Sequence, residues 1–580
     1  MTPAIAALLS FFAYAVAYRY YGGFLTKKVF RLDSSRKTPA HLFQDGVDYV
    51  PTPPFVLFGH HFASIAGLGP MLGPAVAVIW GWVPALLWVV VGAIVVGCVH
   101  DFSAMVLSAR AQGMSIGKVA EGVIGKRART LFHLIIFFGV ALAMGVFVYV
   151  LARLFSVELA PGHAGYPQAV PPSVLLMVLA GICGFLVYRR KWKWFPLATA
   201  AFLMELVSIW WYRDFGPPQW WPTPFTWSVI LLTYAFLAAV LPVWILLQPR
   251  DFLNSLLLYL GIGLAFVGMF VGNPQFDAPA VSFSPDGAPP IFPFVFIVIA
   301  CGAASGFHAL VSSGTTAKQL DKEPHAQPIG YGAMIGESML ALLATLACSA
   351  GFASNTEWHH HYHSWNAAQG LTQNIDAFIA GTSSFVIYLG LPAATASALI
   401  ATVVVSFALT TLDSATRLLR FNIEEIAASA GIQRLNRSIS AAFACGAIAV
   451  FAFYDVGGKP AALALWRLFG TTNQLLAGLT LVLVTAYLRQ RRWPTWPAAI
   501  PAVFMMTSTL VAMVGNLWQF AFGQQADLLL FAVGIILFIL GCWLVVETVL
   551  TLRNPTIQQS VTIEFSDKSS PASASGGQRE

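Results

Sequence analysis

Charged residues are scarce in this chain of 580 residues: Asp, Glu, Lys and Arg make up 10% of it, and hydrophobic residues make up 57%. Soluble domains carry about 25% charged residues. No soluble core could bury so much apolar surface, so the composition excludes an ordinary globular protein and indicates a polytopic membrane protein. The chain has 32 basic and 25 acidic residues. This excess does not indicate nucleic-acid binding, because the basic residues lie mainly in the loops between apolar segments.

Other absences narrow the function. The six cysteines form no close pair and lie in apolar segments, which argues against a disulfide framework. The sequence has no catalytic triad, phosphate-binding loop or Cys/His zinc spacing, so we expect neither an enzyme nor a bound cofactor. It also has no recognisable soluble signalling domain. No basic region precedes the first apolar segment, and we therefore expect a retained helix there instead of a cleaved signal.

About fifteen apolar segments follow one another along the chain. Most of them reach the roughly 20 residues that a spanning helix needs. We therefore expect an all-α membrane protein of about fifteen transmembrane helices, at approximately 2–18, 56–79, 82–108, 131–155, 173–188, 195–212, 227–247, 253–271, 291–311, 331–352, 385–411, 439–454, 463–488, 498–514 and 528–551.

The basic residues test this count. If the N-terminus is outside and every segment crosses, 28 of the 32 basic residues fall in inside loops or in the tail. This distribution obeys the positive-inside rule, and omitting one segment would scramble it downstream. The exceptions are Arg153, Arg213, Lys459 and Arg467. The charge map therefore predicts an outside N-terminus and a cytoplasmic C-terminus.

A short pattern, G-x-H-x5-G, occurs at 59–67, with His61 at its centre, and again at 306–314, with His308. Seven crossings separate the two segments that carry it, so these segments run in opposite directions. This arrangement is an inverted-topology repeat, in which substrate sites form at mid-membrane from broken helices. The two copies predict an inverted-repeat core containing two broken helices.

Glycines and prolines favour an interruption inside segment 56–79, around Pro70 and Pro74. An interruption frees backbone groups that must face protein or a wet cavity. A simple kink for packing is the alternative for this segment. In segment 291–311 and just beyond it, small hydroxyl residues can bind a carboxylate or a cation, and helix packing by small residues is the alternative there. The buried amides near 473 either line the path or cross-link helices. The candidate substrate-binding residues are His61, Ser64, Gly67, Gly69, His308, Ser312, Ser313, Thr315 and Asn473.

Ionisable residues inside apolar spans are expensive, at roughly 2.5–3.5 kcal/mol each on insertion scales, so partners or a function are expected. Histidines and buried carboxylates titrate within reach of physiological pH, which suits proton coupling. For any single residue a structural hydrogen bond is the alternative. The candidate proton carriers are His60, His100, Asp101 and Glu337.

Two further patterns, an Asp–Arg spacing and a histidine-rich run, each allow a functional and a structural interpretation. Asp413 and Arg417 are four residues apart and can pair on one helix face, as a structural salt bridge or as a cytoplasmic gate. An outside loop holds the run EWHHHYHSWN, in which His359, His361 and His363 are candidate metal ligands. A solvated polar loop is the alternative for this run.

Several stretches closely resemble the carbon-starvation protein A family over roughly residues 30 to 555. They are QDGVDYVPT at 44–52, GHHFASIAGLGPMLGP at 59–74, VHDF at 99–102, SGFHALVSSGTTAKQL at 305–320, DSATRLLRF at 413–421 and LWRLFGTTNQLLAG at 465–478. That family comprises bacterial inner-membrane carriers linked to peptide uptake and to proton-driven pyruvate uptake under nutrient limitation. It is grouped with the five-plus-five inverted-repeat symporters.

The resemblance implies that 56–79 and 291–311 are the broken helices and that 227–247 and 253–271 are additional. We accordingly divide the chain into an extra N-terminal helix at 1–30, a transporter core with additional C-terminal helices at 31–555, and a polar disordered tail at 556–580.

The sequence thus predicts a proton-coupled transporter that imports short peptides or pyruvate across the bacterial inner membrane. His61 and His308 would flank the site, and N–H groups of the half-helices would meet the substrate carboxylate. A membrane nutrient sensor without transport is one alternative. A redox protein that binds haem through paired intramembrane histidines is another.

Overall fold

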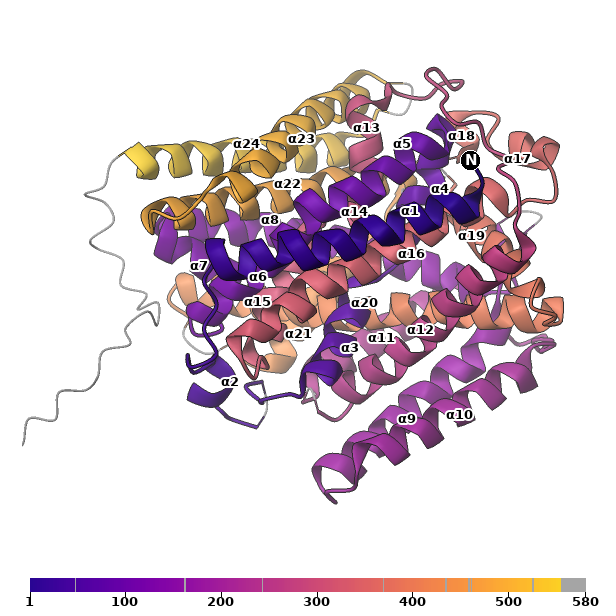
Figure 1. The fold of residues 1–580 in the computed structure, drawn as a ribbon, viewed down its shortest axis with the longest axis horizontal. Helices are drawn as coiled ribbons and strands as arrows, with labels where there is room; N and C mark the ends of the chain where they lie inside the picture. The colour runs from indigo at the N-terminus through magenta and orange to yellow at the C-terminus, as the bar shows by residue number, and fades with distance from the viewer. Residues whose placement is uncertain are drawn as a thin grey trace, which may run out of the picture.

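The structure is a computed structural model of the chain, and it describes residues 1–46, 48–160, 163–242, 244–368, 370–432, 435–456, 459–460, 462–523 and 526–553. Most helices lie along one common direction (Figure 1). Within the described ranges the strands form two short pairs, β1 (Glu158–Ala160) with β2 (His163–Ala164) and β3 (Asp455–Val456) with β4 (Lys459–Pro460). The tail expected at 556–580 lies outside the described residues.

The first half of the chain forms an N-terminal span, the first broken helix and five further long helical segments. Their bounds are α1 (Pro3–Val16), α2 (Pro39–Leu42), α3 (Pro54–Ile65), α4 (Gly69–Ala77), α5 (Trp82–Leu87), η4 (Trp88–Gly97), α6 (Cys98–Arg110), α7 (Ile116–Val123), α8 (Lys126–Phe155), α9 (Val170–Tyr188), α10 (Trp194–Tyr212), α11 (Pro224–Val240) and α12 (Leu247–Gly272).

The second half contains the second broken helix and the C-terminal helices. Their bounds are α13 (Ile291–Val298), α14 (Ala300–Ala303), α15 (Gly306–Gly314), η6 (Thr316–Lys318), η7 (Glu323–His325), α16 (Gly332–Ala350), α17 (Asn355–His361), α18 (Trp365–Ala368), α19 (Leu371–Ile387), α20 (Ala393–Ser429), α21 (Arg437–Ala452), α22 (Ala462–Gln490), α23 (Trp496–Phe522) and α24 (Leu528–Arg553).

The molecule is a multi-pass, all-α membrane protein. By length and composition, eleven helices among the described residues can cross a membrane, or twelve if the bent pair α3–α4 is one span. Large apolar side chains such as Phe12, Val503 and Trp518 are about 70% exposed on the sides of the bundle, as lipid contact requires. The expected count of fifteen is not confirmed, because α11 and α21 are short and the second broken helix is divided into pieces.

Both expected helix interruptions are present. The first lies between α3 and α4, which are bent by 49° around Pro70 and its neighbouring glycines. The second lies between α13 and α15, where Cys301 is extended (ψ 148°) and Gly302 has φ of +86°. The two interruptions touch, because a Cβ on Gly73 would lie 2.5 Å from the carbonyl oxygen of Val298 and one on Gly69 would overlap the Cys301 side chain.

The two broken helices run in opposite directions, as an inverted repeat requires. At one end of the bundle, Thr52 before α3 pairs with Leu320 after α15. At the other end, the indole N–H of Trp80, which follows α4, donates to the carbonyl oxygen of Pro289 before α13 at 3.1 Å. The start of each broken helix therefore lies beside the end of the other.

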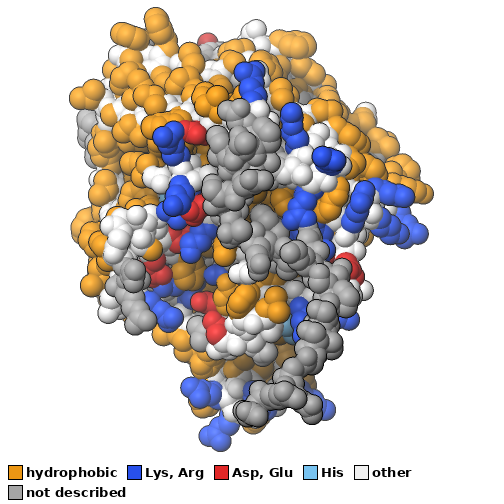
Figure 2. Space-filling model, turned by 90° about the vertical axis from the view of Figure 1, so that its left-hand side faces the viewer, with side chains coloured by type: hydrophobic (Ala, Val, Ile, Leu, Met, Phe, Trp, Pro, Cys, Tyr) orange, Lys and Arg blue, Asp and Glu red, His pale blue; other side chains and the backbone are white. Residues whose placement is uncertain are grey.

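One end of the bundle is rich in basic side chains (Figure 2), and we call it the basic end. Its interior is held by Arg110, which lies 2.6 Å from both Glu323 Oε1 and the Phe30 carbonyl oxygen. The end of α24 lies here as well, because the Thr551 hydroxyl donates to the Ile124 carbonyl oxygen at 3.2 Å. The N-terminus and α17 lie at the opposite end (Figure 1).

Two sequence-based expectations about the fold are wrong. The outside loop that the sequence predicts between the apolar segments 331–352 and 385–411 contains the buried helix α19, which packs against α4, α12, α16 and α20. Its Gly, Ser, Thr and Asn residues lower its mean hydropathy, so the sequence alone does not indicate a buried helix there. The segments expected to be additional, α11 and α12, also lie within the core, since α12 packs directly on α3, whereas the α9–α10 hairpin stands at the edge of the bundle (Figure 1).

Candidate functional site between the two broken helices

A cluster of four buried titratable side chains lies beside the second interruption, and we call it the His308 cluster. Asp101 on α6 joins two histidines, with its two oxygens 2.8 Å from His100 Nδ1 and 2.8 Å from His308 Nδ1. The other ring nitrogen of His308, on α15, lies 3.0 Å from Glu337 on α16. The second oxygen of Glu337 accepts the N–H of Gly302 at 3.2 Å. The cluster therefore ties the interruption itself to three surrounding helices.

The His308 cluster consists entirely of side chains that can bind and release a proton. All four side chains are at most 1% exposed, and two are carboxylates while two are imidazoles. Uncompensated charge is costly at this depth. When both imidazoles are neutral and both carboxylates are ionised, two further protons make the cluster neutral. Adding or removing one proton from that state leaves a net charge that no other group in the cluster compensates.

A second cluster, the Asp251 cluster, lies beside the first interruption. Asp251 on α12 is 2.7 Å from His60 Nδ1 and 3.4 Å from the Ser64 hydroxyl, both on α3. Arg250 lies 3.2 Å from Asp251 and also bonds Asp413 on α20. The Tyr234 hydroxyl donates to Asp413 at 2.6 Å. Two carboxylates face one guanidinium, so the cluster is neutral when one proton resides on His60 or on a carboxylate.

The expected Asp413–Arg417 pair is not among the ion pairs of the described residues. Asp413 bonds Arg250 and Tyr234 instead. Arg417 donates to the carbonyl oxygen of Ala238 at 2.8 Å and to that of Leu241, at the end of α11. These carbonyls have no partner within α11, so a guanidinium satisfies them well. The ion pair at this place thus joins α12 to α20 and does not lie on one helix face.

His61 connects α3 to the segment after the second broken helix. It is fully buried, and its Nδ1 lies 2.9 Å from the Thr316 hydroxyl on η6. Its neighbour His60 points to Asp251 instead, because consecutive side chains on an α-helix diverge by about 100°. The duplicated histidines therefore have different partners: His61 contacts a hydroxyl, and His308 contacts two carboxylates.

Asn473 on α22 binds the start of α15. Its amide oxygen accepts the N–H of Phe307 at 3.0 Å, and its amide nitrogen donates to Cys301 Sγ at 3.3 Å. The Asn473 side chain thus already accepts a hydrogen bond from one of the half-helix N–H groups that we expected to bind a substrate carboxylate. A ligand would have to displace Asn473 to reach this N–H, or bind elsewhere along the interruption.

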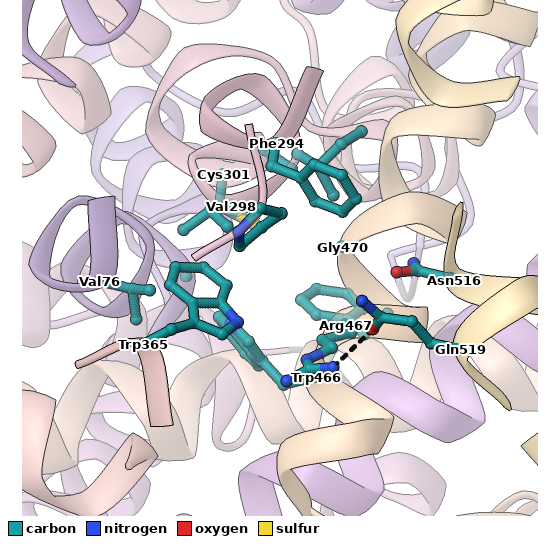
Figure 3. A pocket seen from close by; sticks show the side chains of 15 residues that line it. Val76, Phe294, Val298, Cys301, Trp365, Trp466, Arg467, Gly470, Asn516 and Gln519 are labelled. Carbon is teal, nitrogen blue, oxygen red and sulfur yellow. Dashed lines mark hydrogen bonds between the residues drawn. The ribbon is translucent and has the colours of Figure 1, made fainter. Parts of the chain in front are cut away.

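A pocket opens beside the two interruptions and contains about 730 Å³ of empty space, including its mouth (Figure 3). Gly69 and Cys301 line it from the two broken helices. Trp365, Phe294 and Trp466 supply aromatic walls, and Figure 3 shows them around the opening. The pocket lies in the half of the bundle away from the basic end, since it is also lined by Pro289, before α13.

The remaining predicted substrate residues contact different elements of the bundle. Ser312 donates to the carbonyl oxygen of Asp101 at 3.4 Å, and Gly67 faces Thr411 on α20. Ser313 and Thr315 donate back to carbonyl oxygens of α15. Ser313 also accepts the N–H of Ile116 at 3.1 Å, which places it toward the basic end. These two hydroxyls therefore do not line the pocket of Figure 3.

The histidines of the outer loop do not converge. His361 packs on Tyr362 and Phe352, at 4.7 and 5.7 Å between ring centroids. Burial lowers the pKa of His361, so its ring is neutral at pH 7. His363 Nδ1 lies 2.8 Å from the carbonyl oxygen of His360. No group of three His, Cys, Asp or Glu side chains in the described part of the chain is placed to hold a metal ion, and the predicted site has no geometric support.

Sequence reasoning missed the residues that α11 and α12 contribute. Arg250 and Asp251 follow Pro249 and were assigned to the loop before an apolar segment, yet they are at most 1% exposed. Asn254, one turn later, donates to the Ser406 carbonyl oxygen at 3.1 Å. The adjacent Arg and Asp at the start of an apolar run were the available signal, since such charges are retained in a membrane only with partners.

A membrane bundle in which two oppositely directed broken helices meet beside buried titratable side chains defines the class of secondary transporters. The profile of the family described as "Carbon starvation protein CstA" matches residues 3–372 and 353–512 of the chain. The chain belongs to this family.

Named relatives align over most of their length. The chain is 31% identical to the "Peptide transporter CstA" of Campylobacter jejuni, with 88% of this chain and 80% of that protein covered. It is 33% identical to the "Pyruvate/proton symporter BtsT" of Escherichia coli, with 86% and 80% covered. Among solved structures, a mutant of the Eremococcus coleocola manganese transporter aligns with a TM-score of 0.47 and 13% identity, over 88% of this chain and 98% of that one.

Proposed function

We propose that this protein is a proton-coupled secondary transporter that imports a small carboxylate-bearing nutrient, either a short peptide or pyruvate. The observation that carries the proposal is the contact between the two broken helices, with a buried histidine–carboxylate cluster on each side of it. The names of the relatives support the two substrate classes, and one of those names includes the proton. We propose a carrier with no catalytic step.

Protonation is the coupling chemistry that these clusters favour. Each cluster contains more carboxylates than guanidinium groups, and each becomes neutral on binding protons. In the His308 cluster, Glu337 accepts the N–H of Gly302 at the interruption. A change in the protonation of Glu337 therefore acts directly on the backbone next to Cys301, which lines the pocket of Figure 3. We assign His60, His100, Asp101 and Glu337 as the coupling residues on this ground.

We propose the bacterial cytoplasmic membrane as the location, with the basic end facing the cytoplasm. Lysines and arginines gather on that face (Figure 2), as the positive-inside rule requires. The end of α24 lies at this face and the start of α1 at the opposite one. The orientation therefore gives an outside N-terminus and a cytoplasmic C-terminus, and the pocket of Figure 3 faces the outside.

The haem alternative receives no support from the histidines. Both ring nitrogens of His308 lie against carboxylates, so neither is directed at an open space where an iron could bind. His61 uses one ring nitrogen on Thr316. Transport of a small molecule is the function that accounts for the pocket, the interruptions and both clusters together.

Uptake into proteoliposomes tests the proposal. With an imposed inward proton gradient, we expect accumulation of radiolabelled pyruvate or a dipeptide that a protonophore abolishes. His61→Ala and His308→Ala should each remove gradient-driven uptake, while His359→Ala, in the outer loop, should retain it. Gradient-independent uptake by the unmodified protein would contradict proton coupling, and unimpaired uptake by both histidine variants would contradict the site.

A further inference from the structure

A second cavity lies toward the basic end, between α7, α8, α15 and α20, and we call it the inner cavity. It contains about 1010 Å³ of empty space, including its mouth. Ser313 lines it from α15 and accepts the N–H of Ile116 at 3.1 Å. Tyr49 lines it from the segment that leads into α3, and Lys318 lines it from η6, directly after α15. The inner cavity therefore adjoins segments next to both broken helices.

Two glutamates line the inner cavity, and both already have partners. The Glu424 side chain accepts a hydrogen bond from Arg420 at 2.9 Å. Glu425 accepts the Ser115 hydroxyl at 2.7 Å and lies 3.3 Å from the His133 ring. These carboxylates are therefore engaged with neighbours on α7, α8 and α20 and do not neutralise other charges of the cavity by direct contact.

Two lysines line the same cavity, and they lack such partners. Among the residues that the structure describes, the side chains of Lys118 and Lys318 form no hydrogen bond or ion pair. The Lys318 ammonium lies 5.0 Å from the ring centroid of Phe421 and 5.5 Å from that of Tyr49. Aromatic rings attract a cation but leave its N–H donors without acceptors. Burial lowers the pKa of Lys318, as expected for an ammonium without an adjacent counter-charge.

An anion with two charged groups fits this lining. Each lysine is a point charge with three donors, which suits a carboxylate or a phosphate. An anion with one charged group would leave the second lysine without a counter-charge. The volume of the inner cavity is at the upper end of the roughly 300–1,000 Å³ that small-molecule sites span, so a small organic anion fits inside it.

A ligand on both lysines would join segments that separate when the basic end opens. Lys318 follows the second broken helix, whereas Lys118 lies on α7. The bond between Arg110 and Glu323 closes the same end of the bundle. A ligand that binds this closed arrangement more tightly than an arrangement open at the basic end shifts the population toward the closed one. Occupation of the inner cavity therefore opposes the opening.

We propose that the inner cavity binds a small organic anion with two charged groups from the cytoplasm, held by Lys118 and Lys318, and that this anion inhibits transport by keeping the basic end closed. The site shares no lining residue with the pocket of Figure 3. The two charged groups are either two carboxylates or a carboxylate and a phosphate. The inhibition rests on the proposed transport function, whereas the binding does not.

Thermal unfolding of the purified protein tests the binding site. Succinate carries two carboxylates, 3-phosphoglycerate carries a carboxylate and a phosphate, and propionate carries a single carboxylate. We expect succinate or 3-phosphoglycerate to raise Tm with an apparent Kd at least about tenfold lower than that of propionate. The more effective of the two probes identifies the chemistry of the second charged group.

Variants of the lysines show whether the ligand binds at the inner cavity. Lys118→Gln and Lys318→Gln should each raise the apparent Kd at least about tenfold, because each removes a charge-assisted hydrogen bond. Lys318→Arg, which keeps the charge, should retain the Tm shift. Lys27→Gln is the matched control, since Lys27 is an exposed lysine near Phe30 at the same end and lies outside the cavity lining. Equal affinity for propionate, or binding that both Gln variants leave unchanged, overturns the site.

Uptake into proteoliposomes in which the basic end faces the lumen tests the inhibition. A saturating concentration of the tighter-binding probe inside the vesicles should reduce proton-driven uptake at least about tenfold, whereas the same concentration outside should not. Lys318→Gln should resist this inhibition. If the probe binds but does not inhibit from inside, the inhibitory role fails and the site stands. If binding depends on Lys318 but the unmodified protein shows no uptake, the transport function fails, and the inhibition fails with it, while the site stands.

Discussion

Replacing Arg250 by Met should destabilise the folded protein more than most substitutions, by about 3–5 kcal/mol of unfolding free energy. Arg250 is 1% exposed and bonds both Asp251 and Asp413, which are fully buried. Removing the guanidinium leaves two carboxylates in an apolar interior. Only His60 then remains among the described ion-pair partners of Asp251 to offset their charge.

A double-mutant cycle measures how much of this loss belongs to the Arg250–Asp413 pair. Asp413→Leu alone leaves Arg250 with Asp251, and in the double variant Asp251 keeps the His60 partner and forms a neutral unit. The double variant should therefore lose about 2 kcal/mol less than the sum of the single losses, within the range seen for directly bonded residues. The assay is reversible unfolding in mixed micelles, followed by far-UV circular dichroism.

Arg417 supplies the matched control, because it lies one helical turn from Asp413 but bonds backbone carbonyls of α11 instead. The cycle that combines Arg417→Met with Asp413→Leu should show a coupling of no more than about 0.5 kcal/mol, the value for an i,i+4 pair. Strong coupling to Arg417 together with additive effects at Arg250 would refute the placement of the ion pair between α12 and α20.

Three further substitutions test other parts of the site. Gly302→Ala should cost about 1–3 kcal/mol of unfolding free energy and impair uptake, since φ is +86° and a Cβ would lie 2.6 Å from that of Ala341; Gly181→Ala, where a Cβ meets nothing within 4 Å, should do neither. Asn473→Ala should cost about 1 kcal/mol in the same unfolding assay, because the N–H of Phe307 loses its acceptor. Glu323→Gln, which weakens the bond to Arg110, should expose the chain near residue 31 to trypsin at the basic end, whereas Asp321→Asn should not; equal cleavage of both would contradict a role for Glu323 in holding this end.

Much of the core architecture could be predicted from the sequence, because the signals are local. Prolines and glycines clustered in 67–74 weaken a helix, and the interruption lies at 66–68, directly before Gly69 and Pro70 at the start of α4, while Pro74 is accommodated inside that helix. Each expected apolar segment overlaps a helix. The helix α19 could not be found in this way, since its polar residues are buried against four neighbouring helices and the packing, not the hydropathy, keeps it in place.

The contacts between the site residues could not be predicted from local sequence patterns. Asp413 and Arg417 satisfy the i,i+4 rule, but Arg250, 163 residues earlier, reaches Asp413 across the bundle. The burial of Arg250 depends on the packing of α12 against α3 and α20, which no periodicity encodes. The pairing of His308 with Asp101 and Glu337 has the same origin, although all three residues were candidates individually.

The two consecutive histidines of α3 constrain how this helix can move. His60 holds α3 to α12 through Asp251, while His61 holds it to the segment after α15 through Thr316. A rotation or tilt of α3 that opens the basic end must break at least one of these bonds. If His60 leaves Asp251, two buried carboxylates remain with one guanidinium, and this charge is relieved by a proton on a carboxylate. For the proton-coupled transport that we propose, protonation in the Asp251 cluster would lower the free-energy cost of moving α3 and so link the proton to an alternating-access cycle.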